Sequence, residues 1–340
     1  NLVWCKVSSL QHVKASGNWM YAAKLPGEAS KMYKACTALK ESLIAVGIGI
    51  DGGKDSLSMA AKCGKEIVKA PGELTLTCYV TCPDITKIVT PDVKPSGSSK
   101  LLWIDLSHGH ARLGGSALGQ VYKQLGNECP NIQDFAVLKN AFEVTQTLID
   151  EDLILAGHDR SDGGLIVTLL EMAFAGNCSI DIQLPGGKDV FSTLFNEEAG
   201  IALQVSTENV EKVQQAYSSF GIDCIDIGMP HFEDGDFIKI RVGEDICLDA
   251  PMTQLRNVWE STGFELEKRQ RNPECVRQEQ EGLASRKAPA WKLTYTPQST
   301  PPEILSNRKH KVAILRQEGS NGDREMISAF LTAGLEAWDV

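Results

Sequence analysis

One segment of the chain combines acidic, hydroxyl and glycine residues at the start of a predicted helix. Residues 158–164 read His-Asp-Arg-Ser-Asp-Gly-Gly. In one interpretation, Ser161 or Asp162 caps the helix and the glycines form a turn. In the other, the free N–H groups at the helix start bind a phosphate, and Asp159 supplies an oxygen ligand to an accompanying Mg²⁺. The residue pattern leaves both interpretations open.

A second segment, residues 51–56, has the sequence Asp-Gly-Gly-Lys-Asp-Ser. It is not a P-loop, because the first glycine of that motif is missing and an aspartate follows the lysine. Gly53, Lys54 and the hydroxyl of Ser56 can still form a cradle for an anion, since backbone and side-chain donors lie close together. The alternative is a solvated hairpin or a turn at the end of a strand, and the sequence does not separate the two.

Three other polar segments carry weaker signals. Residues 14–20, continued by 24–28, hold Asn, Trp and Gly in a predicted loop, which suits a ligand pocket but is more typical of a packing corner. Residues 194–200 read Leu-Phe-Asn-Glu-Glu-Ala-Gly and favour a plain turn between a helix and a strand. His108 and His110 favour a surface loop over a metal site. Spacing assigns no Ser/His/Asp triad and no nucleophilic cysteine.

These segments are set in an alternation of predicted helices and strands. Apolar residues at helical spacing predict a helix over 31–46 that ends at Gly47. Strict alternation over 73–80 predicts a half-buried strand, and another strand follows over 101–106. The alternation indicates an α/β or α+β fold. Further helices are predicted around 115–125, 134–150, 163–175 and 208–219, and further strands around 200–206, 222–228 and 236–248.

Two linkers divide the chain. Residues 93–100 are rich in Ser and predict a domain boundary. Residues 252–284 read as charged helix, and 285–309 hold four prolines in a second, irregular linker. After it, a strand over 311–316 and a helix over 323–333 form the opening βα unit of another parallel α/β domain. We expect that domain to be incomplete in this chain.

Composition narrows the functional classes. The chain has 34 Lys and Arg against 44 Asp and Glu, a net charge of −10, and no basic block, which argues against nucleic acid and anionic membrane as partners. No apolar run approaches the roughly 20 residues of a membrane span. The ten cysteines lack zinc-ligand spacing and suit a reducing cytosol, so we expect a cytoplasmic protein. Because the chain begins without Met, we expect an internal piece of a longer protein.

Taken in order, the motifs resemble one family, the large single-chain phosphoribosylformylglycinamidine synthases, also called formylglycinamide ribonucleotide amidotransferases. The resemblance covers essentially the whole chain, and the order of the motifs is more specific than any of them alone. The motifs are Ser-Gly-Asn-Trp-Met at 16–20 with Pro-Gly-Glu at 26–28, Gly-Lys-Asp-Ser-Leu-Ser-Met at 53–59, the segment 158–164, Glu-Met-Ala-Phe-Ala-Gly at 171–176, and Val-Ala-Ile-Leu-Arg-Gln-Glu-Gly-Ser-Asn-Gly-Asp-Arg-Glu-Met at 312–326.

The resemblance implies an aminoimidazole-ribonucleotide-synthetase-like unit of two α/β domains, followed by the first βα unit of a class I glutaminase domain. Residues 1–95 would end the second N-type synthetase domain and 96–250 would form its C-type domain. Residues 251–309 would be a helical segment and linker, and 310–340 the truncated start of the glutaminase domain. The glutaminase's catalytic Cys, His and Glu are expected beyond Val340, so no catalytic residue is assigned to this chain.

Family members make formylglycinamidine ribonucleotide from formylglycinamide ribonucleotide, ATP and glutamine, a step of purine synthesis. ATP phosphorylates the amide oxygen of the substrate, and ammonia from the glutaminase displaces the phosphate, while Mg²⁺ neutralises phosphoryl charge. The partners implied are the first synthetase half and the glutaminase domain of the same polypeptide. Two alternatives are a related kinase or cyclo-ligase, such as a selenophosphate synthetase, which lacks a glutaminase-like tail, and a non-catalytic nucleotide-binding module of the same superfold.

The resemblance also assigns roles to single residues. Asp159 and Asn1 match metal ligands and Ser161 matches a nucleotide contact, at a site that in this half of the enzyme resembles an auxiliary ADP–Mg²⁺ site. The segment 53–56 resembles the part that reaches the catalytic nucleotide and the ribonucleotide phosphate. Lys54 stands where small-subunit relatives are expected to have Asn. Without the other domains, the isolated chain is expected to be inactive.

Overall fold

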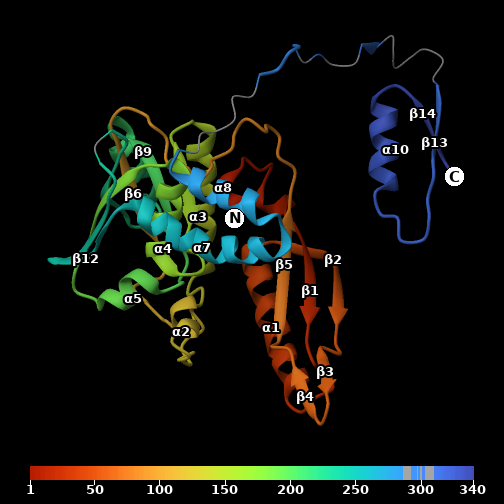
Figure 1. The fold of residues 1–340 in the computed structure, drawn as a ribbon, viewed down its shortest axis with the longest axis horizontal. Helices are drawn as coiled ribbons and strands as arrows, with labels where there is room; N and C mark the ends of the chain where they lie inside the picture. The colour runs from red at the N-terminus through yellow and green to blue at the C-terminus, as the bar shows by residue number, and fades with distance from the viewer. Residues whose placement is uncertain (234, 286–291, 297, 299–300, 303–309) are drawn as a thin grey trace. The chain divides into compact units, whose positions relative to one another are not determined.

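A computed structural model places the chain in two compact units, Asn1–Gln280 and Glu281–Val340 (Figure 1). It describes all residues except 234, 286–291, 297, 299–300 and 303–309. The predicted linker at 285–309 therefore lies largely outside the described residues. The predicted boundary at 93–100 falls inside the first unit and stays a prediction. In the described part of the chain, no helix combines the length and the apolar character needed to cross a membrane.

The first 80 residues build a small three-stranded sheet in the order β2-β1-β5. β1 (Lys14–Met20) runs parallel to β2 (Gly49–Ser56) and antiparallel to β5 (Glu73–Tyr79). The predicted helix at 31–46 is confirmed as α1 (Glu28–Val46), and β5 confirms the strand predicted at 73–80. The remaining elements are the hairpin of β3 (Ala60–Cys63) and β4 (Glu66–Lys69) and the short turns η1 (Leu2–Trp4) and η2 (Leu10–His12).

The loop predicted at 14–20 is wrong, because this segment is a strand, and the segment 51–56 is also strand and not a turn at the end of one. They pair with each other along their whole length, from Lys14 opposite Gly49 to Met20 opposite Ser56. Their Gly, Asn and Ser residues are poor strand formers, and the pairing holds them extended against that preference. The polar residues predicted to line loops therefore stand on the faces of a sheet.

A seven-stranded sheet follows, in the order β12-β11-β8-β10-β6-β9-β7, with all neighbours antiparallel except β11 and β8. Its strands are β6 (Ser99–Asp105), β7 (Ala156–Asp159), β8 (Ser179–Leu184), β9 (Gly200–Ser206), β10 (Cys224–His231), β11 (Ile238–Val242) and β12 (Asp245–Ala250). The predicted helices are confirmed as α2 (Ala117–Val121), α3 (Phe135–Asp150), α4 (Gly164–Gly176) and α6 (Val210–Ser218), and two short elements, α5 (Val190–Phe195) and η3 (Thr207–Asn209), complete the set. The single strand predicted over 236–248 is a hairpin, because Gly243 takes a positive φ of +60° and turns the chain.

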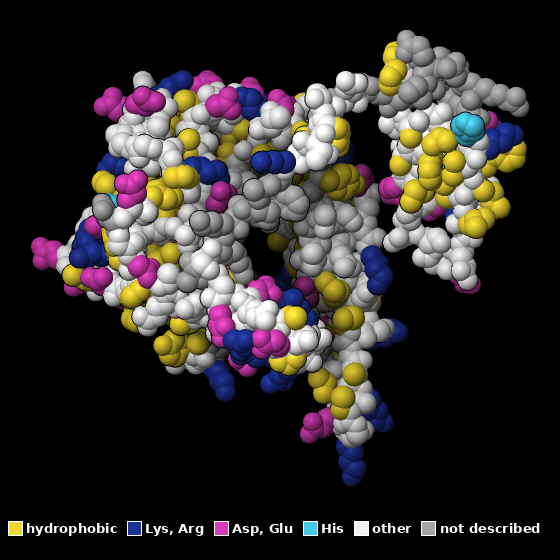
Figure 2. Space-filling model, turned by 45° about the horizontal axis from the view of Figure 1, so that its top comes forward, with side chains coloured by type: hydrophobic (Ala, Val, Ile, Leu, Met, Phe, Trp, Pro, Cys, Tyr) yellow, Lys and Arg dark blue, Asp and Glu magenta, His cyan; other side chains and the backbone are white. Residues whose placement is uncertain are grey.

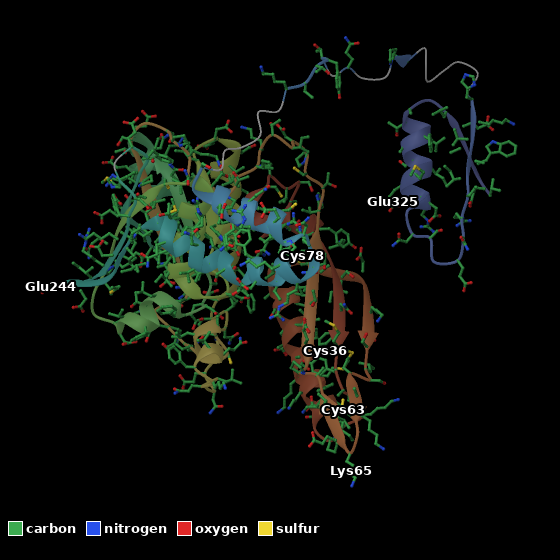
Figure 3. The ribbon with its side chains drawn as sticks, viewed as in Figure 1. Cys36, Cys63, Lys65, Cys78, Glu244 and Glu325 are labelled. Carbon is green, nitrogen blue, oxygen red and sulfur yellow. The ribbon has the colours of Figure 1, made fainter. Side chains whose placement is uncertain are left out.

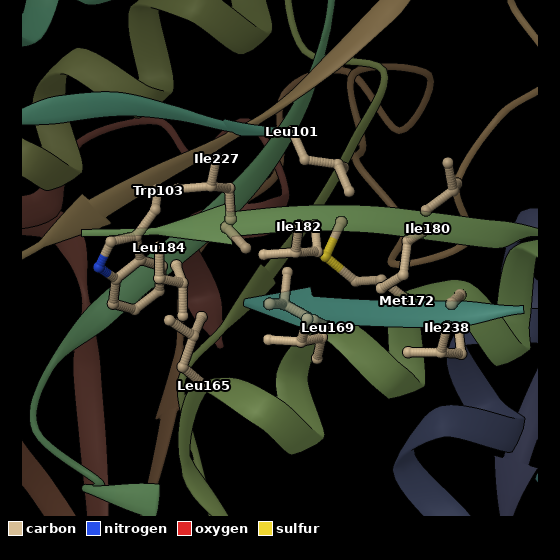
Figure 4. Packing of buried hydrophobic residues seen from close by; sticks show 14 of the residues in the cluster. Leu101, Trp103, Leu165, Leu169, Met172, Ile180, Ile182, Leu184, Ile227 and Ile238 are labelled. Carbon is tan, nitrogen blue, oxygen red and sulfur yellow. The ribbon is translucent and has the colours of Figure 1, made fainter. Parts of the chain in front are cut away.

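The seven-stranded sheet is buried on both faces at β6 and β9. Leu101 and Trp103 of β6 pack into one hydrophobic cluster with α4 (Figure 4), and Leu102 and Ile104 pack into a second cluster with α3 and α6. Successive residues of a strand point to opposite faces, so one apolar run serves both clusters. The strand ends that carry the 158–164 segment are thus anchored in a two-sided core.

The helical region predicted at 252–284 is confirmed as α7 (Met252–Gln270), α8 (Pro273–Glu281) and the 3-10 helix η4 (Gly282–Ser285). α7 packs on α4, where the rings of Trp259 and Phe174 lie 5.9 Å apart. Arg256 Nη1 of α7 donates to Asn177 Oδ1 at the end of α4 over 2.8 Å. This contact places α7 on the α4 side of the seven-stranded sheet.

The second unit holds one more strand than the sequence predicts. β13 (Lys311–Ile314) and α10 (Asp323–Thr332) confirm the βα unit, and β14 (Glu336–Asp339) returns parallel to β13. At four residues, β14 is too short for its alternation to stand out in the sequence. Hydrophobic side chains gather on the surface of this unit (Figure 2), and Leu315 is 80% exposed. The unit is a βαβ motif with little core of its own.

Candidate functional site

A pocket of about 840 Å³ lies between the N-terminal segment, β5, α3 and the ends of β7 and β9. Two predicted metal ligands, Asn1 and Asp159, both line it. The pocket is otherwise mostly apolar, and its other polar and thiol-bearing lining residues are Cys5, Thr77, Cys78, Lys139, Thr145 and Arg160. The fold therefore brings together, from positions far apart in the sequence, the Asn1 amide and the Asp159 carboxylate that the family resemblance assigned to one site.

Asp159 ends β7 and is held from two sides. The indole Nε1 of Trp4 donates to its Oδ1 over 2.8 Å, and the Ser161 hydroxyl donates to its Oδ2 over 2.8 Å. Burial raises the pKa of Asp159, but the hydrogen bonds from Trp4 and Ser161 act against it, and the pKa lies below its ordinary value. The carboxylate is ionised at neutral pH, and each oxygen keeps a lone pair for a further ligand.

Trp4 reaches Asp159 only because Gly157 lies beneath it. A Cβ atom at Gly157 would stand 2.2 Å from Cζ3 of the indole, far inside van der Waals contact. A side chain at this position would push the ring away and with it the Nε1 donor. The glycine in β7 is therefore required by close approach of the N-terminal segment.

The start of α4 does not follow the simple capping interpretation. Its N-cap is Gly163, with φ +87° and no side-chain cap, so neither Ser161 nor Asp162 caps the helix. The Ser161 hydroxyl bonds to Asp159 instead. Gly164 also has a positive φ of +79°, and a Cβ there would lie 2.6 Å from the carbonyl oxygen of Leu194. The two glycines are needed for a left-handed turn packed closely against the end of α5.

The acidic pair at 197–198 is a site element that the sequence interpretation missed. Glu198 is 0% exposed and forms a two-pronged ion pair with Arg112, at 2.5 Å from Nε to Oε1 and 2.8 Å from Nη2 to Oε2. Glu197 Oε1 accepts from the backbone N–H of Gly163 and of Ala117, each over 2.8 Å. The sequence does carry one signal for this contact, two adjacent acidic residues between an apolar helix and an apolar strand. Carboxylates in such a place are buried and therefore need hydrogen-bonding or charged partners.

Arg160 links this acidic segment to the pocket. Its Nε donates to the carbonyl of Glu198, and its Nη2 donates to Asp105 Oδ1 and to the Ala199 carbonyl, each over 3.0 Å. The guanidinium also stands 4.8 Å from the ring centre of Trp103. These contacts hold the backbone that follows Asp159 in one place.

The other predicted ligands, Gly53, Lys54 and Ser56, lie on β2, and none of them lines this pocket. Lys54 Nζ donates to Ser56 Oγ over 2.8 Å on one face of the sheet. A Cβ at Gly53 would lie 2.2 Å from the carbonyl oxygen of Gly17, so tight pairing with β1 explains this glycine without any phosphate. Asn18 stands opposite Lys54 in register, and its Oδ1 is buried without a hydrogen-bond partner.

A metal at Asp159 would have few protein ligands. Among the described residues, no group of three or more His, Cys, Asp or Glu side chains is arranged to hold a metal ion. The described cysteines are all free, and Cys36, Cys63 and Cys78 are spread along the three-stranded part of the chain (Figure 3). Asp159 and Asn1 supply two oxygens, which fits Mg²⁺, because that ion takes its remaining ligands from phosphates and water.

Comparison with known proteins identifies the family. Two models of known domains match, one described as FGAR-AT PurM_N-like domain at residues 1–81 and one as AIR synthase related protein, C-terminal domain, at residues 100–230. Over its whole length the chain is 53% identical to the probable phosphoribosylformylglycinamidine synthase, chloroplastic/mitochondrial, of Arabidopsis thaliana and 46% identical to the phosphoribosylformylglycinamidine synthase of Homo sapiens. The chain belongs to the phosphoribosylformylglycinamidine synthase family. It spans about a quarter of these relatives, 24% of the first and 26% of the second.

Solved structures of synthases share the fold. T. maritima PurL complexed with ADP matches 97% of this chain, and 45% of its own, with a TM-score of 0.52 at 12% identity. PurLQS from Thermotoga maritima matches 74% of this chain, and 38% of its own, with a TM-score of 0.53 at 13% identity. The α/β fold related to aminoimidazole ribonucleotide synthetase, predicted from the motifs, is confirmed, as is the synthase family itself.

Proposed function

We propose that the chain is part of an ATP-dependent ligase that makes formylglycinamidine ribonucleotide from formylglycinamide ribonucleotide, ATP and glutamine in purine biosynthesis. The observation that carries this proposal is the alignment of the whole chain with curated synthases at 53% and 46% identity. Related T. maritima PurL structures are complexes with ATP, with ADP and with FGAR. Glutamine-derived ammonia would reach the synthetase from the glutaminase domain.

Within that enzyme, the Asp159 pocket would bind a nucleotide with Mg²⁺. Asp159 and Asn1 would hold the ion, and Ser161 would contact the nucleotide while orienting the carboxylate. When bound, Mg²⁺ neutralises the phosphate charge. The N–H groups of Gly163 and Gly164 donate to Glu197 and Ser161. The N–H groups that follow them in the first turn of α4 have no intrahelical acceptor, which suits an anion.

Lys54 and Ser56 would act at a different place, the face of β2. Their ammonium and hydroxyl groups lie 2.8 Å apart on an exposed strand, where both can donate to a phosphate of the substrate or the catalytic nucleotide. Gly53 would contribute by letting β2 approach β1. The separation of this face from the Asp159 pocket favours a second candidate function for the pocket, a non-catalytic nucleotide site that supports the fold.

Residues 310–340 would begin the class I glutaminase domain. The parallel β13-α10-β14 motif suits the edge of such an α/β domain. The last cysteine of the chain is Cys275, before this motif, so the nucleophile of a glutaminase is absent here and the chain alone would release no glutamate from glutamine. A cytoplasmic location suits the free cysteines, although the name of the Arabidopsis relative includes chloroplastic/mitochondrial.

Asp159→Asn in the full-length protein tests the nucleotide pocket. Bound nucleotide stabilises the fold by mass action, about 3–4 kcal/mol at 100–1,000 times the dissociation constant. The thermal shift that Mg-ADP gives in the wild type should therefore be largely lost in the variant. Asp162→Asn is the matched control, because Asp162 is an exposed neighbour that does not line the pocket. Equal shifts in the wild type and Asp159→Asn would remove the assignment.

A further inference from the structure

The segment 194–200 contacts the Asp159 loop at three residues, Arg160, Gly163 and Gly164. The backbone N–H of Arg160 donates to the carbonyl of Gly200 over 2.8 Å, and the Arg160 side chain donates to the carbonyls of Glu198 and Ala199. Gly164 packs on the backbone of residues 194–195. Between these two anchors, and among the described residues, Glu197 is the side chain of this segment that bonds to the loop backbone, through the N–H of Gly163.

We propose that Glu197 is a positioning residue that sets the geometry of the Asp159 loop for the nucleotide. The inference rests on the proposed function of the pocket. Its Oε1 accepts at once from the N–H of Gly163, the N-cap of α4, and from the N–H of Ala117, the first residue of α2. One oxygen therefore fixes the left-handed turn that follows Asp159. It also connects this turn to the segment between β6 and α3, which contains α2.

The contact matters because the N-cap residue supplies no side-chain cap, and the turn is otherwise closed by the backbone bond from the Gly164 N–H to the Ser161 carbonyl. α4 begins without a side-chain cap of its own, and both residues of its first turn, Gly163 and Gly164, have positive φ values. Glycines hold such a conformation at no steric cost but are free to leave it. The Gly163 N–H bond to Glu197 restricts that freedom, so that the carboxylate of Asp159 and the open N–H groups of α4 keep a fixed distance from each other.

The geometry distinguishes an acceptor role from a charge role. Both hydrogen bonds end on the same oxygen, Oε1, so the amide oxygen of glutamine can take over both. Glu197→Gln should therefore keep the loop in place, and Glu197→Ala should release it. The neighbouring Glu198 offers a contrast, because it uses both of its oxygens on Arg112 and Asn131.

The test measures Mg-ADP affinity by titration calorimetry in the full-length protein, together with the melting temperature of each variant. We expect Glu197→Ala to weaken binding about tenfold, since it removes two hydrogen bonds that are each worth roughly a factor of two to ten. Glu197→Gln keeps both acceptors and should stay within about threefold of the wild type. Gln204→Ala is the control for plain destabilisation. Gln204 is 0% exposed and its amide bonds to Lys94 and Ser99, away from the loop.

The inference requires that Gln204→Ala lower the melting temperature without changing affinity, while Glu197→Ala changes affinity. Equal affinity of Glu197→Ala and wild type would overturn the positioning role and leave the proposed nucleotide site intact. A glutamine variant as weak as the alanine variant would also overturn it, because the charge and not the acceptor geometry would then be responsible. Failure of the wild type itself to bind Mg-ADP would overturn the proposed function of the pocket and this inference together.

Discussion

The two sheets of the first unit bear different candidate sites and are covered very differently. In the seven-stranded sheet, buried residues of β6, β8, β9 and β11 enter two hydrophobic clusters, and most of β6 is buried. In the three-stranded sheet, β2 is exposed along almost its whole length, and β5 alternates only between exposed and half-buried residues. Side chains around Asp159 are thus held by the fold itself, whereas Lys54 and Ser56 stand on a strand whose folding depends little on them.

The comparison predicts that site residues of the two sheets differ in what a substitution costs. Buried, bonded groups near the Asp159 pocket should affect stability first and function as a consequence. Exposed groups on β2 should affect function with little change in stability. The predictions that follow test this difference, beginning with the largest expected effect.

Glu198→Gln should give the largest loss of stability. It leaves the Arg112 guanidinium with a neutral partner at a fully buried carboxylate position, and breaking a buried ion pair costs about 3–5 kcal/mol. Urea unfolding at neutral pH measures the loss. Glu73→Gln on the exposed strand β5 is the control and should change stability by about 0.5 kcal/mol or less. Similar losses for both variants would erase the contrast between the sheets.

The same residue predicts a pH dependence. Burial raises the pKa of Glu198, but hydrogen bonds from the Arg112 side chain and from the backbone of Arg112 and Asn131 hold it below its ordinary value of 4.5. The folded state therefore binds this proton less readily than the unfolded state. The ionised carboxylate stabilises the protein above pH 4.5, and that contribution is lost as the pH falls through the lower folded-state pKa. Glu198→Gln should lose less stability than the wild type over this acidic range.

A matched pair of isoleucines tests the hydrophobic side of the comparison. Ile182 on β8 is 0% exposed, so Ile182→Ala leaves a cavity and should cost about 2–5 kcal/mol. Ile67 on β4 is 63% exposed, so Ile67→Ala should change stability by about 0.5 kcal/mol or less. Chemical denaturation of both variants decides the point. A large loss for Ile67→Ala would show that the β3–β4 hairpin is covered in the protein as it exists.

The smallest effect on stability is expected at β2, together with a clear effect on turnover. Lys54→Met or Ser56→Ala in the full-length enzyme should lower turnover by about tenfold or more, the size expected for a hydrogen bond lost from a charged group, while the melting temperature stays unchanged. Lys65→Met at the tip of the β3–β4 hairpin (Figure 3) is the control for loss of one exposed lysine. If both variants turn over like the wild type, the face of β2 is simply solvated.

The sequence predicts elements whose signal is local. The apolar spacing of α1 and the alternation of β5 are sufficient to predict these two elements, because each pattern is a period within one element. The sequence does not predict strands at 14–20 and 51–56, because their extended form depends on pairing with each other across the intervening helix. Strand pairing between distant segments leaves no local periodicity in residues such as Gly, Asn and Ser.

The residues of the candidate site differ in the same way: the sequence predicts those with a local signal and misses those that depend on distant partners. Asp159 could be singled out from its neighbours, but its position beside Asn1 came from family resemblance and not from spacing. Glu197 was set aside as part of a turn, since nothing in one sequence shows that its oxygen meets the N–H groups of Gly163 and Ala117. Partners of buried carboxylates are long-range contacts, so the sequence shows the need for partners and the fold supplies their identity.

The contact between Trp4 and Gly157 also constrains how this chain can vary. Position 157 can gain a side chain only if position 4 becomes smaller, because an added Cβ would stand 2.2 Å from the indole. A smaller residue at position 4 would also remove the N–H that Asp159 accepts. The two positions should therefore change together or not at all among relatives, and a pair that has changed should mark a lineage in which the carboxylate is oriented by another group.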